Sequence, residues 1–297
     1  MDQCISLAKL KFRLGIGLLP GFICKCLDGL LGFTRINRLY SESVKYNADH
    51  KNITFFEAVL KQLDIRMEVQ PEDIAKIPRE GPLLVVANHP FGGIDGLALG
   101  SLLSKTRSDF KILVNQELGV FQAMKPWLFQ VDILGGKSSR AQNLRTMAES
   151  SRYLRKGYCL GVFPAGEVSS LHLRTRKIID PEWSNHPVTL ARRNNAIILP
   201  VCFKGKNGWL FQVLGLVDPR LRTLLLAREL VNKRGKDLNM RIGEPVSAMK
   251  ICSFEKVTDA TEYLRVCVEA LKNESHQVSS FAKFFAGCKS KCVEELV

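Results

Sequence analysis

A chain of 297 residues, 46% hydrophobic and 24% charged, has enough apolar surface for one large folded domain, because single cores stop growing near about 250–300 residues. This composition excludes a disulfide-stapled miniprotein, a collagen-like chain and a disordered chain. The formal charge of +14 favours an anionic partner, either nucleic acid, acidic lipid or an acidic carrier protein. Most of this charge lies in residues 137–241, which contain 20 Lys and Arg but 7 Asp and Glu.

Nine cysteines without a CxxC pair, and a start that lacks the cleavage site of a secretory signal, predict reduced thiols in the cytoplasm. The spacings Cys24-x-Cys26 and Cys288-x-x-x-Cys292 match no standard zinc pattern. We therefore expect no bound metal.

The longest apolar run near the start, Leu14 to Cys24, is 11 residues long and contains Pro20, whereas a membrane-spanning helix needs about 20 apolar residues. After this break, Phe22, Cys26 and Leu30 share one helical stripe. The stripe has two interpretations. It is either a helix lying in a membrane interface, which the nearby basic residues favour, or a helix packed on its own domain.

Farther along the chain, apolar β-rich runs alternate with helical patterns, which predicts an α/β fold with a mostly parallel sheet flanked by helices. The predicted strands are 83–87, 110–114, 158–163, 196–203 and 209–214. The predicted helices are 53–63, 97–105, 116–129, 139–156, 187–194 and 254–272. We accordingly expect an N-terminal helical segment (1–78), a central domain (79–247), and a C-terminal helix with a tail (248–297).

The most informative segment is Asn88-His89-Pro90-Phe91-Gly92-Gly93-Ile94-Asp95-Gly96, in which an apolar strand runs into a turn and then a helix. This places His89 at the carboxyl end of a strand, the edge where ligands bind in open α/β sheets. The Pro and Gly residues let the chain fold back, so that Asp95 can reach the imidazole. A His oriented by an Asp is a general base, although a structural His at a strand end explains this pair equally well.

This segment resembles the first signature of the glycerolipid acyltransferase family, the lysophosphatidic acid acyltransferase type, in which the His deprotonates the acceptor. Four residues separate the His and the Asp in that family, and five separate His89 from Asp95. The longer form is similar to a bacterial branch often labelled hemolysin-like, which includes acyltransferases that form amino-acid-containing lipids. The resemblance implies that His89 and Asp95 are catalytic.

Three further segments follow in the order of the family's signatures, and the resemblance covers about residues 80–245. Lys111–Leu118 with Pro126-Trp127 is similar to the second signature, which contributes to the acceptor pocket. Val162–Ser170 is similar to the third signature. Ile198–Val201 is similar to the fourth signature, a strand that lines the acyl site. The resemblance implies substrate binding by Asn88, Gly92, Gly93, Gly96, Asn115, Phe163, Pro164, Gly166, Glu167 and Pro200.

The third signature is usually Phe-Pro-Glu-Gly-Thr-Arg-Ser, but here Ala165, Glu167 and Val168 replace its Glu, Thr and Arg. The family uses that Arg to hold an acceptor phosphate, and a Val side chain cannot. A glycerol 3-phosphate acceptor is therefore disfavoured, unless the cations of 174–177 restore the contact; a solvated basic loop also explains that run. Glu167 either meets an amine or hydroxyl of the acceptor or holds the turn by accepting backbone N–H groups.

These features predict an enzyme that moves a fatty acyl group from acyl-ACP or acyl-CoA to a hydroxyl of a lyso-lipid, with His89 as base and Asp95 orienting it. The expected acceptor is a lyso amino-acid lipid, with a lysophospholipid as the alternative. We expect no bound cofactor, and a location in the cytoplasm on the inner face of the cell membrane, whose anionic surface the basic charge suits. Two other classes stay open: a nucleic-acid-binding protein, for which no motif is found, and a non-catalytic membrane-binding protein.

Overall fold

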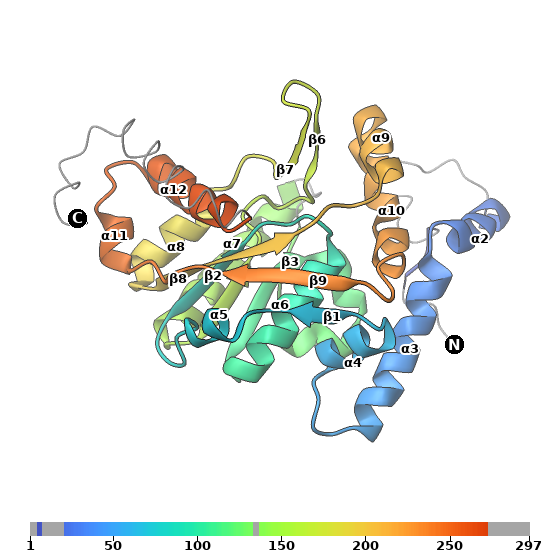
Figure 1. The fold of residues 1–297 in the computed structure, drawn as a ribbon, viewed down its shortest axis with the longest axis horizontal. Coiled ribbons are helices and arrows are strands. Elements are labelled where there is room, and N and C mark those ends of the chain that lie inside the picture. The colour runs from blue at the N-terminus through green and yellow to red at the C-terminus, as the bar shows by residue number, and fades with distance from the viewer. Residues whose placement is uncertain (1–4, 8–20, 133–136, 273–297) are drawn as a thin grey trace.

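The computed structural model describes residues 5–7, 21–132 and 137–272 (Figure 1). The chain begins with α2 (Gly21–Leu30), α3 (Phe33–Asp49), α4 (Phe55–Gln62), β1 (Arg66–Glu68), α5 (Pro71–Ala75), β2 (Leu83–Ala87) and α6 (Gly93–Thr106). It continues with β3 (Phe110–Asn115), the 3₁₀ helices η1 (Gln116–Val120) and η2 (Gln122–Trp127), β4 (Leu128–Val131), α7 (Lys137–Arg155), β5 (Cys159–Val162), β6 (Ser170–His172) and β7 (Lys177–Ile179). The last elements are α8 (His186–Asn194), β8 (Ile197–Lys204), α9 (Trp209–Val217), α10 (Pro219–Val231), β9 (Asp237–Ile242), α11 (Ala248–Cys252) and α12 (Val257–Ala270). No helix in these ranges is both long enough and apolar enough to cross a membrane.

Seven strands form the central sheet in the order β1-β9-β8-β2-β5-β3-β4. All neighbouring pairs are parallel except β8 and β9. Strands β6 and β7 form a separate antiparallel hairpin. The predicted fold class, a mostly parallel sheet flanked by helices, is confirmed.

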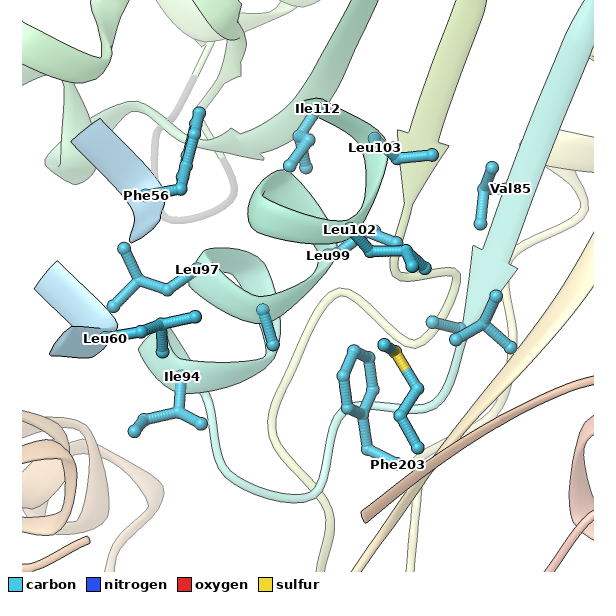
Figure 2. Packing of buried hydrophobic residues seen from close by; sticks show 14 of the residues in the cluster. Phe56, Leu60, Val85, Ile94, Leu97, Leu99, Leu102, Leu103, Ile112 and Phe203 are labelled. Atoms are coloured by element: carbon cyan, nitrogen blue, oxygen red, sulfur yellow. The ribbon is translucent and has the colours of Figure 1, made fainter. Parts of the chain in front are cut away.

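Strand β2 lies at the centre of the sheet, and every one of its residues is buried. Its side chains alternate between two apolar cores, as the period of a strand requires. Leu83 and Val85 pack into the core that holds α4 and α6 (Figure 2), while Leu84 and Val86 face the core formed with α7, α8 and α12. Helices on both faces explain why this strand reads as a continuous apolar run.

Two of the predicted elements were wrong in type. The run 209–214, predicted as a strand, is the first part of helix α9, because periodicity alone does not separate a short apolar strand from a helix. The predicted helix 116–129 is instead η1, η2 and the start of β4. Pro126 lies inside η2, and a Pro removes a backbone donor that an α-helix would use.

Helix α2 packs on its own domain, but not through the predicted stripe: Cys26 is exposed and Leu30 is 64% exposed, so the buried face is the one that carries Cys24 and Asp28. Its Cys24 is fully buried, in a cluster with Leu7, Phe33 and Leu224 of α10. Pro20 lies outside the described residues. The break that the structure shows is at Gly32, between α2 and α3, where φ is 87°.

Candidate active site

His89 is the second residue after the end of β2, so it lies at the carboxyl edge of the sheet. Its Nδ1 lies 3.0 Å from Oδ2 of Asp95, in the first turn of α6. The Asp95 side chain is completely buried, whereas that of His89 is 18% exposed. The sequence prediction that the loop folds back and brings these two groups together agrees with this geometry.

The same carboxylate also closes the loop between β2 and α6. Oδ2 of Asp95 accepts hydrogen bonds from the N–H groups of Phe91, at 2.9 Å, and Gly92, at 3.0 Å. Burial raises the pKa of Asp95 above its usual value, while His89 and the two N–H groups oppose that rise. The loop geometry and the position of the imidazole therefore depend on one side chain.

The two glycines of the loop allow α10 to cover it. Gly92 has φ 91°, and a Cβ there would lie 2.9 Å from Leu226 and 3.3 Å from Val168. A Cβ on Gly93 would lie 2.7 Å from Leu230 of the same helix. At either position a Cβ would require a Leu side chain of α10 to move, and at Gly92 the positive φ would in addition strain any other residue.

Asp180 ties the backbone of His89 to the third segment. Its Oδ1 accepts the N–H of His89 at 3.2 Å and also the hydroxyl of Ser169, and its Oδ2 accepts the indole N–H of Trp183 at 3.0 Å. The N–H of Ser169 in turn donates to the carbonyl of His89 at 2.9 Å. Sequence reasoning missed Asp180, which follows β7 and is 91 residues from His89 along the chain.

The ring of Phe163, just after β5, stacks on the imidazole of His89, with centroids 4.2 Å apart and planes at 29°. One face of the ring is therefore covered. No described residue forms a hydrogen bond with Nε2 of His89. Gly96 lies one residue beyond Asp95, and a Cβ there would meet no atom within 4 Å, so open space adjoins this part of α6.

A buried carboxylate beside a partly exposed imidazole at a sheet edge is the arrangement that a general base needs. The model of the acyltransferase family matches residues 18–277. The chain belongs to this family. It is an acyltransferase.

Two curated relatives carry the name lyso-glycine lipid O-acyltransferase. The one from Phocaeicola vulgatus is 26% identical over 235 residues, which cover 77% of this chain and 80% of the relative. The one from Bacteroides thetaiotaomicron is 27% identical over 260 residues, or 85% of this chain and 91% of the relative. The crystal structure of the 1-acyl-sn-glycerophosphate (LPA) acyltransferase PlsC from Thermotoga maritima gives a TM-score of 0.47 at 16% identity, over 92% of each chain.

The third segment of the acyltransferase forms a tight turn beside His89. Gly166 has φ 68°, and its N–H donates to the carbonyl of Phe163 at 3.0 Å. Pro164 is buried, and its carbonyl accepts the N–H of Ser184 at 2.9 Å. These contacts make the segment a rigid support for the ring that covers His89.

Glu167 forms a short ion pair with Arg222 of α10. The carboxylate is about half exposed, whereas the Arg222 side chain is 10% exposed. Neither sequence interpretation of Glu167 included this partner, which lies 55 residues away on another helix. The turn therefore holds an Arg, although Val168 occupies the position where the family has one.

Three predicted substrate-binding residues of the acyltransferase, Asn88, Asn115 and Pro200, make contacts within the fold. The side-chain amide of Asn88 forms two hydrogen bonds with the backbone of Phe203 in β8, at 2.9 and 2.7 Å. Oδ1 of Asn115 accepts the N–H of Glu117 at 3.1 Å and caps η1. Pro200 is buried within β8, paired in register with Val86 of β2.

A cavity of about 230 Å³ adjoins the loop between β2 and α6, on the side of β8 and β9. Its lining includes Phe91 and Ile94 of the loop and the lysines 204, 206, 233 and 236. Burial lowers the pKa of Lys233, one of these four lysines, and Glu229, 3.3 Å away, opposes that shift. Sequence analysis found the basic charge of this part of the chain but not its convergence on one cavity.

No group of three or more His, Cys, Asp or Glu side chains within residues 5–7, 21–132 and 137–272 is arranged to hold a metal ion. Cys24 and Cys26 belong to α2, and Cys288 and Cys292 lie outside the described residues.

Proposed function

We propose that this acyltransferase moves a fatty acyl group from a thioester to a hydroxyl of a lyso-lipid, with His89 as the general base. The observation that carries the proposal is the contact of 3.0 Å between Nδ1 of His89 and the buried carboxylate of Asp95. The proposed tautomer carries its proton on Nδ1, 3.0 Å from the Asp95 carboxylate, so its lone pair lies on Nε2, the nitrogen that no described residue uses.

In the proposed reaction, Nε2 of His89 takes the proton of the acceptor hydroxyl as the hydroxyl oxygen attacks the carbonyl carbon of the thioester. The carbonyl electrons move to oxygen and form a tetrahedral oxyanion. When the carbonyl re-forms, the C–S bond breaks and the thiolate takes the proton from Nε2. Proton transfer of this kind contributes about 10²–10⁴-fold to the rate.

The oxyanion is assigned to the turn after Phe163. The loop N–H groups beside His89 already donate to Asp95. By contrast, the N–H groups of Glu167 and Val168 donate to no partner in the described part of the chain. Backbone donors fixed in advance stabilise developing negative charge without reorganising during the reaction.

The proposed acceptor is a lyso-glycine lipid. Its support is the name of the two curated relatives, which cover most of this chain. A glycine joined through its nitrogen presents a carboxylate, and Arg222 is the guanidinium that the structure brings to the third segment. The same guanidinium suits the phosphate of a lysophospholipid, so we test that acceptor beside the first.

The proposed donor is acyl-ACP or acyl-CoA, and the proposed location is the cytoplasmic surface of the cell membrane. Both donors carry their thioester on a phosphate-containing arm. The cavity with four lysines beside the catalytic loop supports an anionic donor, because several cations around one hollow attract such a group before contact.

The test is an assay of the purified full-length protein with acyl-CoA or acyl-ACP and either lyso-glycine lipid or lysophosphatidic acid, with products identified by mass spectrometry. We expect a new ester with the glycine lipid, and a rate lowered at least about 10²-fold in His89→Ala. His186→Ala is the matched control, because His186 starts α8 and lies outside the site. An unchanged rate in His89→Ala would refute the mechanism. If only lysophosphatidic acid gives a product, the acceptor is a lysophospholipid and not a glycine lipid.

A further inference from the structure

Helix α9 has one buried and one exposed apolar face. Its nine residues carry no charge. Phe211 is fully buried in a cluster with Val168 and Leu225, so one face packs on the domain. The opposite face exposes four large side chains, Trp209, Val213, Leu216 and Val217, of which Trp209 is 76% and Val217 73% exposed. These four follow the spacing of a single helical stripe, which we call the α9 stripe.

The hairpin β6–β7 extends this surface and adds positive charge. The N–H of Leu171 in β6 donates to the side-chain carbonyl of Gln212 in α9 at 2.9 Å, so the two elements lie side by side, as Figure 1 shows. Between its strands the hairpin exposes Leu173, which is 69% exposed. The cations Arg174, Arg176 and Lys177 are also exposed, and none forms an ion pair with a described carboxylate.

This combined surface is joined by direct contacts to the loop that carries His89. The residue before β6 is Ser169, whose N–H donates to the carbonyl of His89. Val168 belongs to the same apolar cluster as Phe211 of α9, and it also lies beside Gly92 of the catalytic loop. A molecule seated on the α9 stripe would therefore lie close to the segments that hold His89.

We propose that the α9 stripe and the tip of the β6–β7 hairpin dock on an anionic lipid bilayer. The α9 stripe and Leu173 enter the boundary between headgroups and acyl chains, and the three hairpin cations bind headgroup phosphates. An uncharged apolar helix face bordered by cations is the pattern of a helix that lies in a membrane interface. The identity of the surface as lipid rests on the proposed function, because a lipid acceptor would enter from the bilayer.

A second copy of the chain fits the same surface less well. In a two-fold dimer a patch meets its own equivalent, so the three hairpin cations would face three like charges across the interface. An anionic bilayer covers the apolar residues and neutralises those cations together.

The fluorescence of Trp209 tests this directly, because Trp183 is buried and Trp127 is half-buried in the core against Phe56. Full-length protein is mixed with phosphatidylglycerol vesicles whose acyl chains are brominated, or with matched phosphatidylcholine vesicles. We expect a blue shift and quenching with the anionic vesicles, and neither change in Trp209→Phe. The contribution of Trp209 is the difference between the wild-type and Trp209→Phe spectra, because the other two tryptophans emit in both. A Trp209 contribution that is already blue-shifted without vesicles, or one that stays unchanged when the protein sediments with them, would overturn the proposal.

Partition to vesicles gives a second test with a matched control. Val213→Asp with Val217→Asp should lower the partition coefficient at least about tenfold, because a charge in the interface opposes apolar burial. Met249→Asp removes an equally exposed apolar side chain from α11, at the other end of the molecule (Figure 1), and should leave partition unchanged. Equal effects of the two changes would show that the α9 stripe has no special role.

One further comparison separates this proposal from the proposed function. With a short-chain acceptor that stays monomeric in water, the α9 variants should keep the wild-type rate, and with the acceptor embedded in vesicles they should lose most of it. Vesicle binding through Trp209 without acyl transfer would leave the docking surface standing and remove the acyltransfer proposal. Acyl transfer in a protein whose Trp209 stays in water would leave the acyltransfer proposal standing and remove the docking surface.

Discussion

Oδ2 of Asp95 lies 3.0 Å from Nδ1 of His89, and the same oxygen accepts two backbone N–H groups of the loop between these residues. The carboxylate therefore fixes the loop and orients the imidazole at the same time. Because Asp95 is completely buried, its charge depends on these three contacts. The loop cannot move without changing the position of the proposed base.

Replacing the carboxylate by an amide should separate these two roles. In Asp95→Asn the amide oxygen can still accept the loop N–H groups, but it leaves the tautomer of His89 unspecified. We expect kcat to fall about 10²–10⁴-fold with the fold retained, as judged by circular dichroism and steady-state kinetics. Asp73→Asn is the matched control, since Asp73 is also buried but pairs with Lys76 and Arg241 outside the site. A similar kcat loss in both variants would mean that Asp95 acts only through stability.

Gly92 should tolerate no side chain. Gly92→Ala places a Cβ 2.9 Å from Leu226 and forces Ala to φ 91°, a backbone region that costs about 1–3 kcal/mol. We expect lower stability in urea unfolding and a kcat lowered about 10²-fold, because small shifts of a catalytic group are expensive. Gly81→Ala is the control: Gly81 has φ 80°, but its Cβ would meet no atom within 4 Å. That variant should lose stability from the backbone alone and keep its kcat.

The site could be predicted where its parts are local in sequence. A buried strand, a turn of Pro and Gly and a helix start bring His89 and Asp95 together within seven residues, so their contact follows from the local sequence. The ion pair of Glu167 with Arg222 joins residues 55 positions apart, and no pattern in either segment indicates the other. The run 209–214 was misjudged because a short apolar segment fits a strand or a helix, and only its packing through Phe211 decides.

Arg222 should affect acceptor binding more than turnover. Arg222→Met removes the guanidinium that the structure places beside the third segment, so the KM for an anionic acceptor should rise about tenfold or more with a smaller change in kcat. Arg222→Lys keeps the charge but not the bidentate geometry and should give an intermediate KM. Steady-state kinetics with a glycine lipid and with its uncharged methyl ester is the measurement. An equal KM for the two acceptors in the wild type would contradict the role of Arg222.

Asp73 should make stability depend on acid pH. It accepts the N–H of Ile242 and pairs with Arg241 and Lys76. Burial alone would raise the pKa of Asp73, but these partners outweigh it and hold the pKa below the usual 3.8. A depressed folded-state pKa contributes stability above the unfolded pKa, and this contribution is lost as pH falls through the folded pKa.

Asp73→Asn should therefore lower the free energy of unfolding by about 1–3 kcal/mol at pH 7, with the difference shrinking below about pH 4. Urea unfolding of the wild type and the variant at several pH values measures the difference in unfolding free energy and its dependence on pH. A difference that stays constant down to pH 2 would show that the charge of Asp73 is not the cause.

The lysine cavity should set the affinity for the acyl donor. Lys204→Glu with Lys206→Glu reverses two of the four cations beside Phe91, so the KM for acyl-CoA or acyl-ACP should rise about tenfold at low salt and by less at high salt. The KM for the acceptor should not change, because Arg222 and the α9 stripe lie on other elements. Lys45→Glu with Lys51→Glu makes the same charge change at exposed positions of α3 and its C-terminal end, and it serves as the control for net charge. If both double variants raise the donor KM equally, the overall field of the protein, and not the cavity, attracts the donor.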